Sequence, residues 1–262
     1  MLKKSMRVLL AALCAIGLFA GTASARDEVL LQDMINLEKA YIPPLFFTNQ
    51  ADMLLPAKKG MMILRSEWNA FKLAYYDYKP NYNNWQVYLD TAEYAIQDAE
   101  AIVASVTPAN PATLILAHEA LEGVRMTMLE LRTHNGFPKF ITDAMTTYHG
   151  PMEYIVIALK TQPMSPALIE DVTATYKIAE KAWTKVEKCP VDPGMWGFSN
   201  EKMQLYYSLL VKERAALDNF AAALESGDPA AIKMTGTLAI KQPFVDAYIL
   251  FADLTPFAPP AQ

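Results

Sequence analysis

The chain has 262 residues, 53 % of them hydrophobic, with 28 acidic side chains against 23 lysines and arginines. This acidic balance argues against nucleic acid and anionic membrane surfaces as partners, because both carry negative charge themselves. Two cysteines leave little scope for disulfide bonds, and the absence of a Cys-x-x-Cys-His motif excludes c-type haem.

The first 25 residues have the three parts of a secretory signal peptide. A basic start over residues 3–7 precedes an apolar run over 8–20, and small residues at 23–25 supply a cleavage site. The apolar run of 13 residues is short for a membrane span, which needs about 20. We therefore expect an exported, periplasmic protein without a membrane anchor after cleavage. The remaining 237 residues carry a net charge of −8 and a single cysteine, Cys189.

The remaining sequence predicts an all-α fold. Glycine is scarce, alanine, leucine and glutamate are common, and proline concentrates at boundaries between apolar periodic segments. We expect an up-and-down antiparallel bundle of roughly seven to nine helices, with or without a C-terminal helical hairpin packed on it. The predicted helices cover residues 28–40, 44–55, 57–77, 85–105, 111–133, 139–160, 166–187, 200–226 and 229–253.

The expected organisation is a single helical domain over residues 26–254. If the domain is divided, the turn-rich connector 189–198 is the expected boundary. A proline-rich tail, 255–262, follows and is expected to fray. The length suffices for one large domain or two small bundles, and no convincing internal repeat is evident. Ser165 and Asp228 each precede a proline and are predicted to cap the helices that begin there.

All three histidines fall within one 32-residue stretch, and two of them are followed by a glutamate four positions later. His118-x-x-x-Glu122 and His149-x-x-x-Glu153 each place an imidazole and a carboxylate one helical turn apart. A short turn near 133–138 predicts that the two helices are antiparallel neighbours. With a rise of about 1.5 Å per residue, His118 is then level with Glu153, and His149 with Glu122.

Two imidazoles and two carboxylates in adjacent layers predict a site for iron, zinc, copper or manganese. Nearby thioethers would add soft donors and favour copper. These possible extra donors are Met126, Met145 and Met152. Noncovalent haem b, ligated by methionine and histidine from facing helices, is a weaker variant of the hypothesis.

Two features oppose a metal site. Arg125 lies one turn past Glu122 and brings a permanent positive charge, while Gly150-Pro151 is able to break the second helix and move Glu153. The alternative interpretation is that His–Glu and Arg–Glu pairs simply bridge two helices as partly buried hydrogen bonds.

A second candidate surface is the connector 189–198, because ordered loops carry function disproportionately. Its predicted partner-binding residues are Pro190, Met195, Trp196 and Phe198. The aromatic segment 68–88 is another possible recognition surface, but the helical spacing of its rings favours a place in the core.

The leading functional hypothesis is a periplasmic binding protein that holds a transition-metal ion or a metal-containing cofactor. The alternative is a non-catalytic accessory module that binds another exported protein, with the His–Glu pairs purely structural. An enzyme with His118 or His149 as a general base comes third, because no nucleophile motif or phosphate-binding loop is present.

Overall fold

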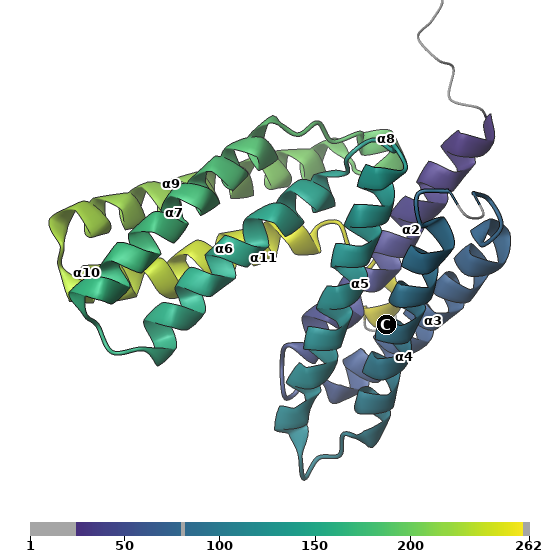
Figure 1. Cartoon of the computed structure of the whole chain (residues 1–262), viewed down its shortest axis with the longest axis horizontal. Helices are drawn as coiled ribbons and strands as arrows, with labels where there is room; N and C mark the ends of the chain where they lie inside the picture. Colours follow the sequence, from purple (N-terminus) through teal and green to yellow (C-terminus); the bar gives the residue numbers. More distant parts are fainter. Residues whose placement is uncertain (1–24, 80–81, 259–262) are drawn as a thin grey trace, which may run out of the picture.

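The computed structural model describes residues 25–79 and 82–258 (Figure 1). Every regular element within these ranges is a helix, which confirms the predicted all-α bundle. The expected signal peptide, apart from Ala25, and the last four residues of the expected tail lie outside the described residues. No helix in the described ranges is both long and apolar enough to cross a membrane.

The first half of the chain forms an up-and-down four-helix bundle. Its helices are α2 (Ala25–Thr48), α3 (Leu54–Tyr75), α4 (Trp85–Ser105) and α5 (Leu114–His134), the last preceded by the short η1 (Pro111–Thr113). Helix α2 packs along α3 and α4 packs along α5, while α2 and α5 also contact each other.

The second half repeats this arrangement. Its elements are α6 (Ile141–Thr161), α7 (Pro166–Lys188), α8 (Pro193–Trp196), α9 (Asn200–Ser226), α10 (Pro229–Met234), the π-helical turn η2 (Thr235–Ala239), α11 (Ile240–Ile249) and η3 (Thr255–Phe257). Helix α6 packs along α7 and α9 packs along α11. The two bundles diverge in Figure 1 and meet where α2 and α5 approach α6 and α11.

The turn between α5 and α6 therefore joins the two bundles. The connector 189–198, where we expected any division, lies inside the second bundle, because α7 and α9 on either side of it pack in the same unit. Each bundle also opens with a proline-containing helix in which a buried tyrosine shortly precedes the proline. These pairs are Tyr41 with Pro43 and Tyr148 with Pro151.

Helix α2 replaces two predicted helices, 28–40 and 44–55, because its prolines do not break it. Pro43 has no N–H, so the carbonyl of Lys39 loses its usual partner one turn earlier. The backbone N–H of Asp253 donates to this carbonyl at 3.0 Å. The segment after α11 thus satisfies the group that Pro43 leaves free, and the helix continues.

The predicted helix 229–253, in contrast, is divided at η2. A Cβ atom on Gly236 would lie 2.4 Å from Cδ1 of Leu159 and 2.5 Å from the ring of Phe220, so the chain passes too close to its neighbours for a side chain. Pro243 adds a second disturbance, because it cannot donate to the carbonyl one turn before it.

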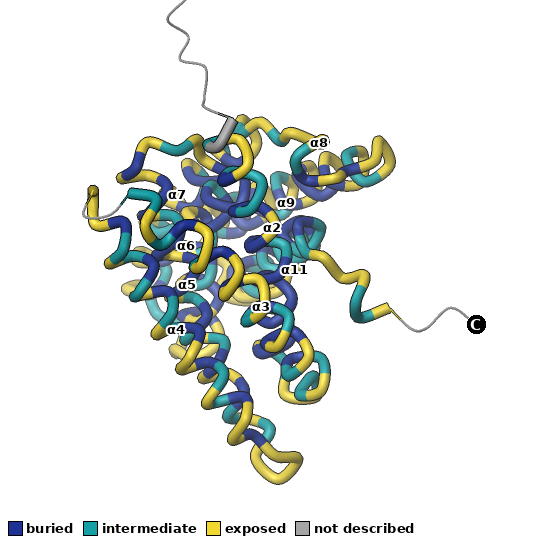
Figure 2. The backbone as a smooth tube through the Cα atoms, turned by 90° about the vertical axis from the view of Figure 1, so that its right-hand side faces the viewer, coloured by how far each residue is buried: buried dark blue, intermediate teal, exposed yellow. Residues whose placement is uncertain are grey.

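The core follows the facing sides of the helices in both bundles (Figure 2). Most of the aromatic segment 68–88 belongs to it: Trp68, Phe71 and Tyr75 are buried, as their spacing predicts. Trp85, outside that spacing, is fully buried too, whereas Tyr82 is 56 % exposed. The tail is not wholly frayed, because the ring of Phe257 lies 4.9 Å from that of Phe47.

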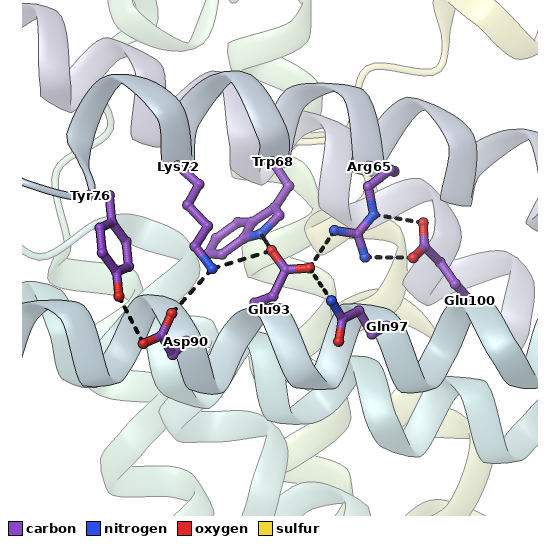
Figure 3. A network of polar contacts seen from close by, with 8 residues as sticks. All are labelled: Arg65, Trp68, Lys72, Tyr76, Asp90, Glu93, Gln97 and Glu100. Atoms are coloured by element: carbon purple, nitrogen blue, oxygen red, sulfur yellow. Dashed lines mark hydrogen bonds and ion pairs between the residues drawn. The ribbon is translucent and has the colours of Figure 1, made fainter.

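A ladder of polar contacts joins α3 to α4 (Figure 3). Arg65 pairs with Glu93 at 2.6 Å and also with Glu100, while the indole N–H of Trp68 donates to Glu93 at 2.6 Å. The participating residues recur every three or four positions, so they share one face of each helix. The ladder fixes the pairing of two helices that otherwise pack mainly on α2 and α5.

Candidate functional site

The four predicted metal ligands lie on α5 and α6, near the junction of the two bundles. These helices are not the antiparallel neighbours expected, because the turn between them directs them into different bundles. His149 Nδ1 nevertheless lies 3.9 Å from Glu122 Oε2, the pairing that the depth calculation predicts. His118 does not pair with Glu153: its Nε2 lies 3.6 Å from Glu122 Oε1 on its own helix.

Arg125 occupies the middle of this cluster and is only 4 % exposed. Its Nη2 donates to Glu122 Oε2 and, at 2.8 Å, to His149 Nδ1. A guanidinium only donates, so His149 accepts through Nδ1 and carries its hydrogen on Nε2. Burial, followed by the positive charge of Arg125, lowers the pKa of His149 well below its usual value. His149 is therefore neutral at pH 7.

His118 has the opposite tautomer. Its Nδ1 lies 2.9 Å from the carbonyl oxygen of Leu45 on α2. A carbonyl only accepts, so Nδ1 carries the hydrogen and neutral His118 presents the lone pair of Nε2 towards Glu122. Oε1 of Glu122 is buried and has no hydrogen-bond partner among the described residues. In the neutral form of His118, two acceptors thus face each other across 3.6 Å.

Glu153 and the three methionines do not join the cluster. Lys241 on α11 holds Glu153 at 2.9 Å, and their 88-residue separation left no signal in the sequence from which to predict this pair. Met126 is 46 % exposed, whereas Met145 and Met152 are fully buried in the core. None of the three lines the cavity beside the histidines.

This cavity has a volume of about 50 Å³ and is lined by His118, Glu122, Arg125 and His149, among others. The volume suits an ion with one or two water molecules. It is far below the roughly 300–1,000 Å³ of pockets for organic ligands, so haem b does not fit it. Within residues 25–79 and 82–258, no group of three or more His, Cys, Asp or Glu side chains is arranged to hold a metal ion.

Two of the four residues predicted to bind a partner through the connector are buried aromatic side chains. Trp196 and Phe198 are 4 % and 9 % exposed, and both rings pack against Phe251 at the end of α11. Pro190 is exposed and Met195 is half-buried. A partner-binding role for the connector remains a prediction, in which these last two side chains supply the accessible surface.

The sequence points to His118, Glu122 and Arg125, but it does not show how they divide their hydrogen bonds. Leu45 on α2 completes the site through its backbone carbonyl, which the spacing of residue types in the sequence cannot reveal.

No protein-family model, no curated protein and no solved structure matches this chain.

Proposed function

We propose that the mature chain is an exported, non-catalytic binding protein that holds a transition-metal ion between His118 and Glu122. The observation that carries this proposal is the pair of facing acceptors, the Nε2 lone pair and the unpartnered carboxylate oxygen. Two lone pairs repel each other, and a shared cation removes the repulsion. The signal-peptide pattern of residues 1–25 supports export.

The separation of the two atoms fits a shared metal ion. With bonds near 2.1 Å and a tetrahedral angle, two zinc ligands lie about 3.4 Å apart, close to the observed 3.6 Å. The bond from His118 Nδ1 to the carbonyl of Leu45 is also the outer contact that typically orients a metal-binding histidine.

Arg125 limits the strength of such a site. It supplies a permanent charge next to the proposed cation and engages His149 Nδ1, so the chain offers two donors and water fills the other positions. The donors are nitrogen and oxygen, which suit Zn²⁺ better than Cu⁺. We therefore expect binding of moderate affinity with Zn²⁺ as the appropriate probe.

Calorimetric titration of the untagged mature chain with ZnCl₂ tests the proposal. We expect one equivalent to bind, and His118→Gln to weaken binding about tenfold or more. His134→Gln is the matched control, because His134 lies on the same helix and stacks on Tyr88 away from the cluster. Failure to bind one equivalent, or unchanged affinity in His118→Gln, contradicts the proposal.

The Arg125 bridge favours a second candidate, an accessory module in which the cluster only holds the two bundles together. Arg125 connects Glu122 of α5 with His149 of α6 and is almost completely buried. Under this candidate the same titration gives no heat of binding, and His118→Gln changes only the free energy of unfolding.

A further inference from the structure

A groove of about 720 Å³ lies in the described part of the molecule. Helices α2 and α3, the connector and residues 249–257 form its walls, and Ile249 also lines the small cavity beside His118. The volume lies within the roughly 300–1,000 Å³ typical of pockets for small organic ligands.

Two half-buried lysines face this groove, Lys39 on α2 and Lys202 in the first turn of α9. No described carboxylate lies within ion-pair distance of either ammonium group. Lys39 Nζ instead donates to the carbonyl of Met195 at 3.4 Å, and Lys202 Nζ lies 4.2 Å from the centre of the Phe198 ring. Neither ammonium group therefore forms an ion pair, although the charge of Asp253, which also lines the groove, favours the protonated form of both.

The charge of Lys39 also acts on Lys202. Burial, followed by the charge of Lys39, lowers the pKa of Lys202, so an anion between them would relieve both desolvation and repulsion. Two carboxylates, Glu67 and Asp253, also line the groove, and Asp253, whose Oδ1 accepts the backbone N–H of Thr255 at 2.9 Å, partly offsets this effect.

The remaining walls combine aromatic rings and a backbone turn. Trp196, Phe251 and Phe257 line the groove, and the first two rings pack at 4.8 Å. Gly197 has a φ of +67°, and a Cβ there would make only an ordinary contact, at 3.8 Å, with Lys39 Nζ. Paired cations beside apolar rings match a ligand with an anionic head and an apolar body.

We propose that this groove binds a small organic anion, with a carboxylate or phosphate head between Lys39 and Lys202 and its apolar part against the aromatic wall. The connector thereby serves as a wall of a ligand site. The groove uses none of the side chains proposed to bind metal, so the two proposals fail independently.

Three probes that share a phenyl ring test the proposal by calorimetry on the mature chain: phenylacetate, phenyl phosphate and phenethylamine. We expect at least one anion to bind and the amine, whose charge is opposite, not to bind. The tighter anion identifies the head group that the site prefers. Lys39→Gln with Lys202→Gln should weaken anion binding about tenfold or more.

Two further double variants separate the loss of this site from a loss of folding. Lys39→Arg with Lys202→Arg keeps both charges and should retain binding. Lys177→Gln with Lys212→Gln removes the same charge from exposed positions of α7 and α9, and should bind like the wild type. The proposal is overturned if neither anion binds, if the amine binds equally well, or if both glutamine double variants behave alike.

Discussion

Glu213 on α9 is a fully buried carboxyl group in the core of the second bundle. The hydroxyl of Tyr148 on α6 donates to it, so the pair joins two helices of that bundle. Burial raises the pKa of Glu213 to about 8. The folded protein therefore keeps this carboxyl protonated at neutral pH, whereas the unfolded chain releases the proton above about pH 4.5.

Glu213→Gln should stabilise the protein increasingly as the pH rises. Between about pH 5 and 8 the folded state holds one more proton than the unfolded state, so the wild type should lose about 1.4 kcal/mol per pH unit relative to the variant. Urea unfolding of both proteins across this range measures the difference. A difference that is independent of pH shows that Glu213 titrates normally.

Of the two approaches that the helix rise predicts in the histidine cluster, one is confirmed and one is wrong, because His118 does not pair with Glu153. The spacing of His149 and Glu122 relative to the turn correctly places them near each other. The tautomers of His118 and His149 follow from Leu45 and Arg125, whose positions depend on how the bundles pack. Local spacing contains no information on that packing.

Among the helices, Gly236 marks the closest approach of one element to its neighbours. Gly236→Ala should destabilise the protein by about 1–3 kcal/mol, because the new methyl group overlaps fully buried atoms of Leu159 and Phe220. Gly123→Ala is the matched control: its Cβ would lie 3.7 Å from Ala95, an ordinary contact. It should instead stabilise α5 by about 0.5–1 kcal/mol.

Thermal or urea unfolding of the two glycine variants gives the comparison directly. If Gly236→Ala is as stable as Gly123→Ala, the tight packing of η2 against α6 and α9 is not what requires glycine at this position.

Helix starts are the elements that the sequence predicts best. Ser165 Oγ accepts the N–H of Leu168 at 3.2 Å, and Asp228 Oδ1 accepts that of Ala230 at 3.0 Å, as their places before proline indicate. Pro43, in contrast, led to a wrong prediction of a helix boundary, because α2 continues through it. Whether a proline ends a helix depends on what happens to the carbonyl it frees, and here the partner comes from the far end of the chain.

For the molecule as a whole, Arg132 forms a buried ionic connection between the two bundles. It lies on α5, is 1 % exposed, donates to Glu38 of α2 at 2.8 Å and also pairs with Asp143 of α6. Asp143 in turn accepts the N–H of Phe140 and caps α6 where the second bundle begins. The orientation of the bundles therefore depends on a buried group of three charges.

Arg132→Leu should destabilise the whole protein by about 3–5 kcal/mol, because it leaves two buried carboxylates without a cation. Arg214→Leu provides the matched control, since Arg214 pairs with Glu187 and Glu180 near the surface. Its loss should cost about 1 kcal/mol or less. Equal losses in urea unfolding would show that the buried group contributes no more than a surface network.

The division into two similar bundles is the feature that the sequence predicts least. The length allows two bundles, but the similarity between them is a packing arrangement, and no convincing internal repeat is evident in the sequence. The direction that the chain takes after α5 depends on contacts made by Arg132 and Phe137 with distant segments. Hydrophobic periodicity indicates which face of a helix is buried, but it does not indicate which other helix covers that face.

The bond from Asp253 to the carbonyl of Lys39 joins residues that are far apart in the order of synthesis. A chain emerging from the ribosome presents α2 first, with a carbonyl that nothing made up to that point is positioned to satisfy. The residues that pack on this side of α2 and α3 are synthesised long afterwards. One of them is Pro256, whose carbonyl accepts from Lys59 across 197 residues. Such distant contacts slow folding relative to an ordinary helical bundle. The first bundle therefore reaches its final form only after the second has been made.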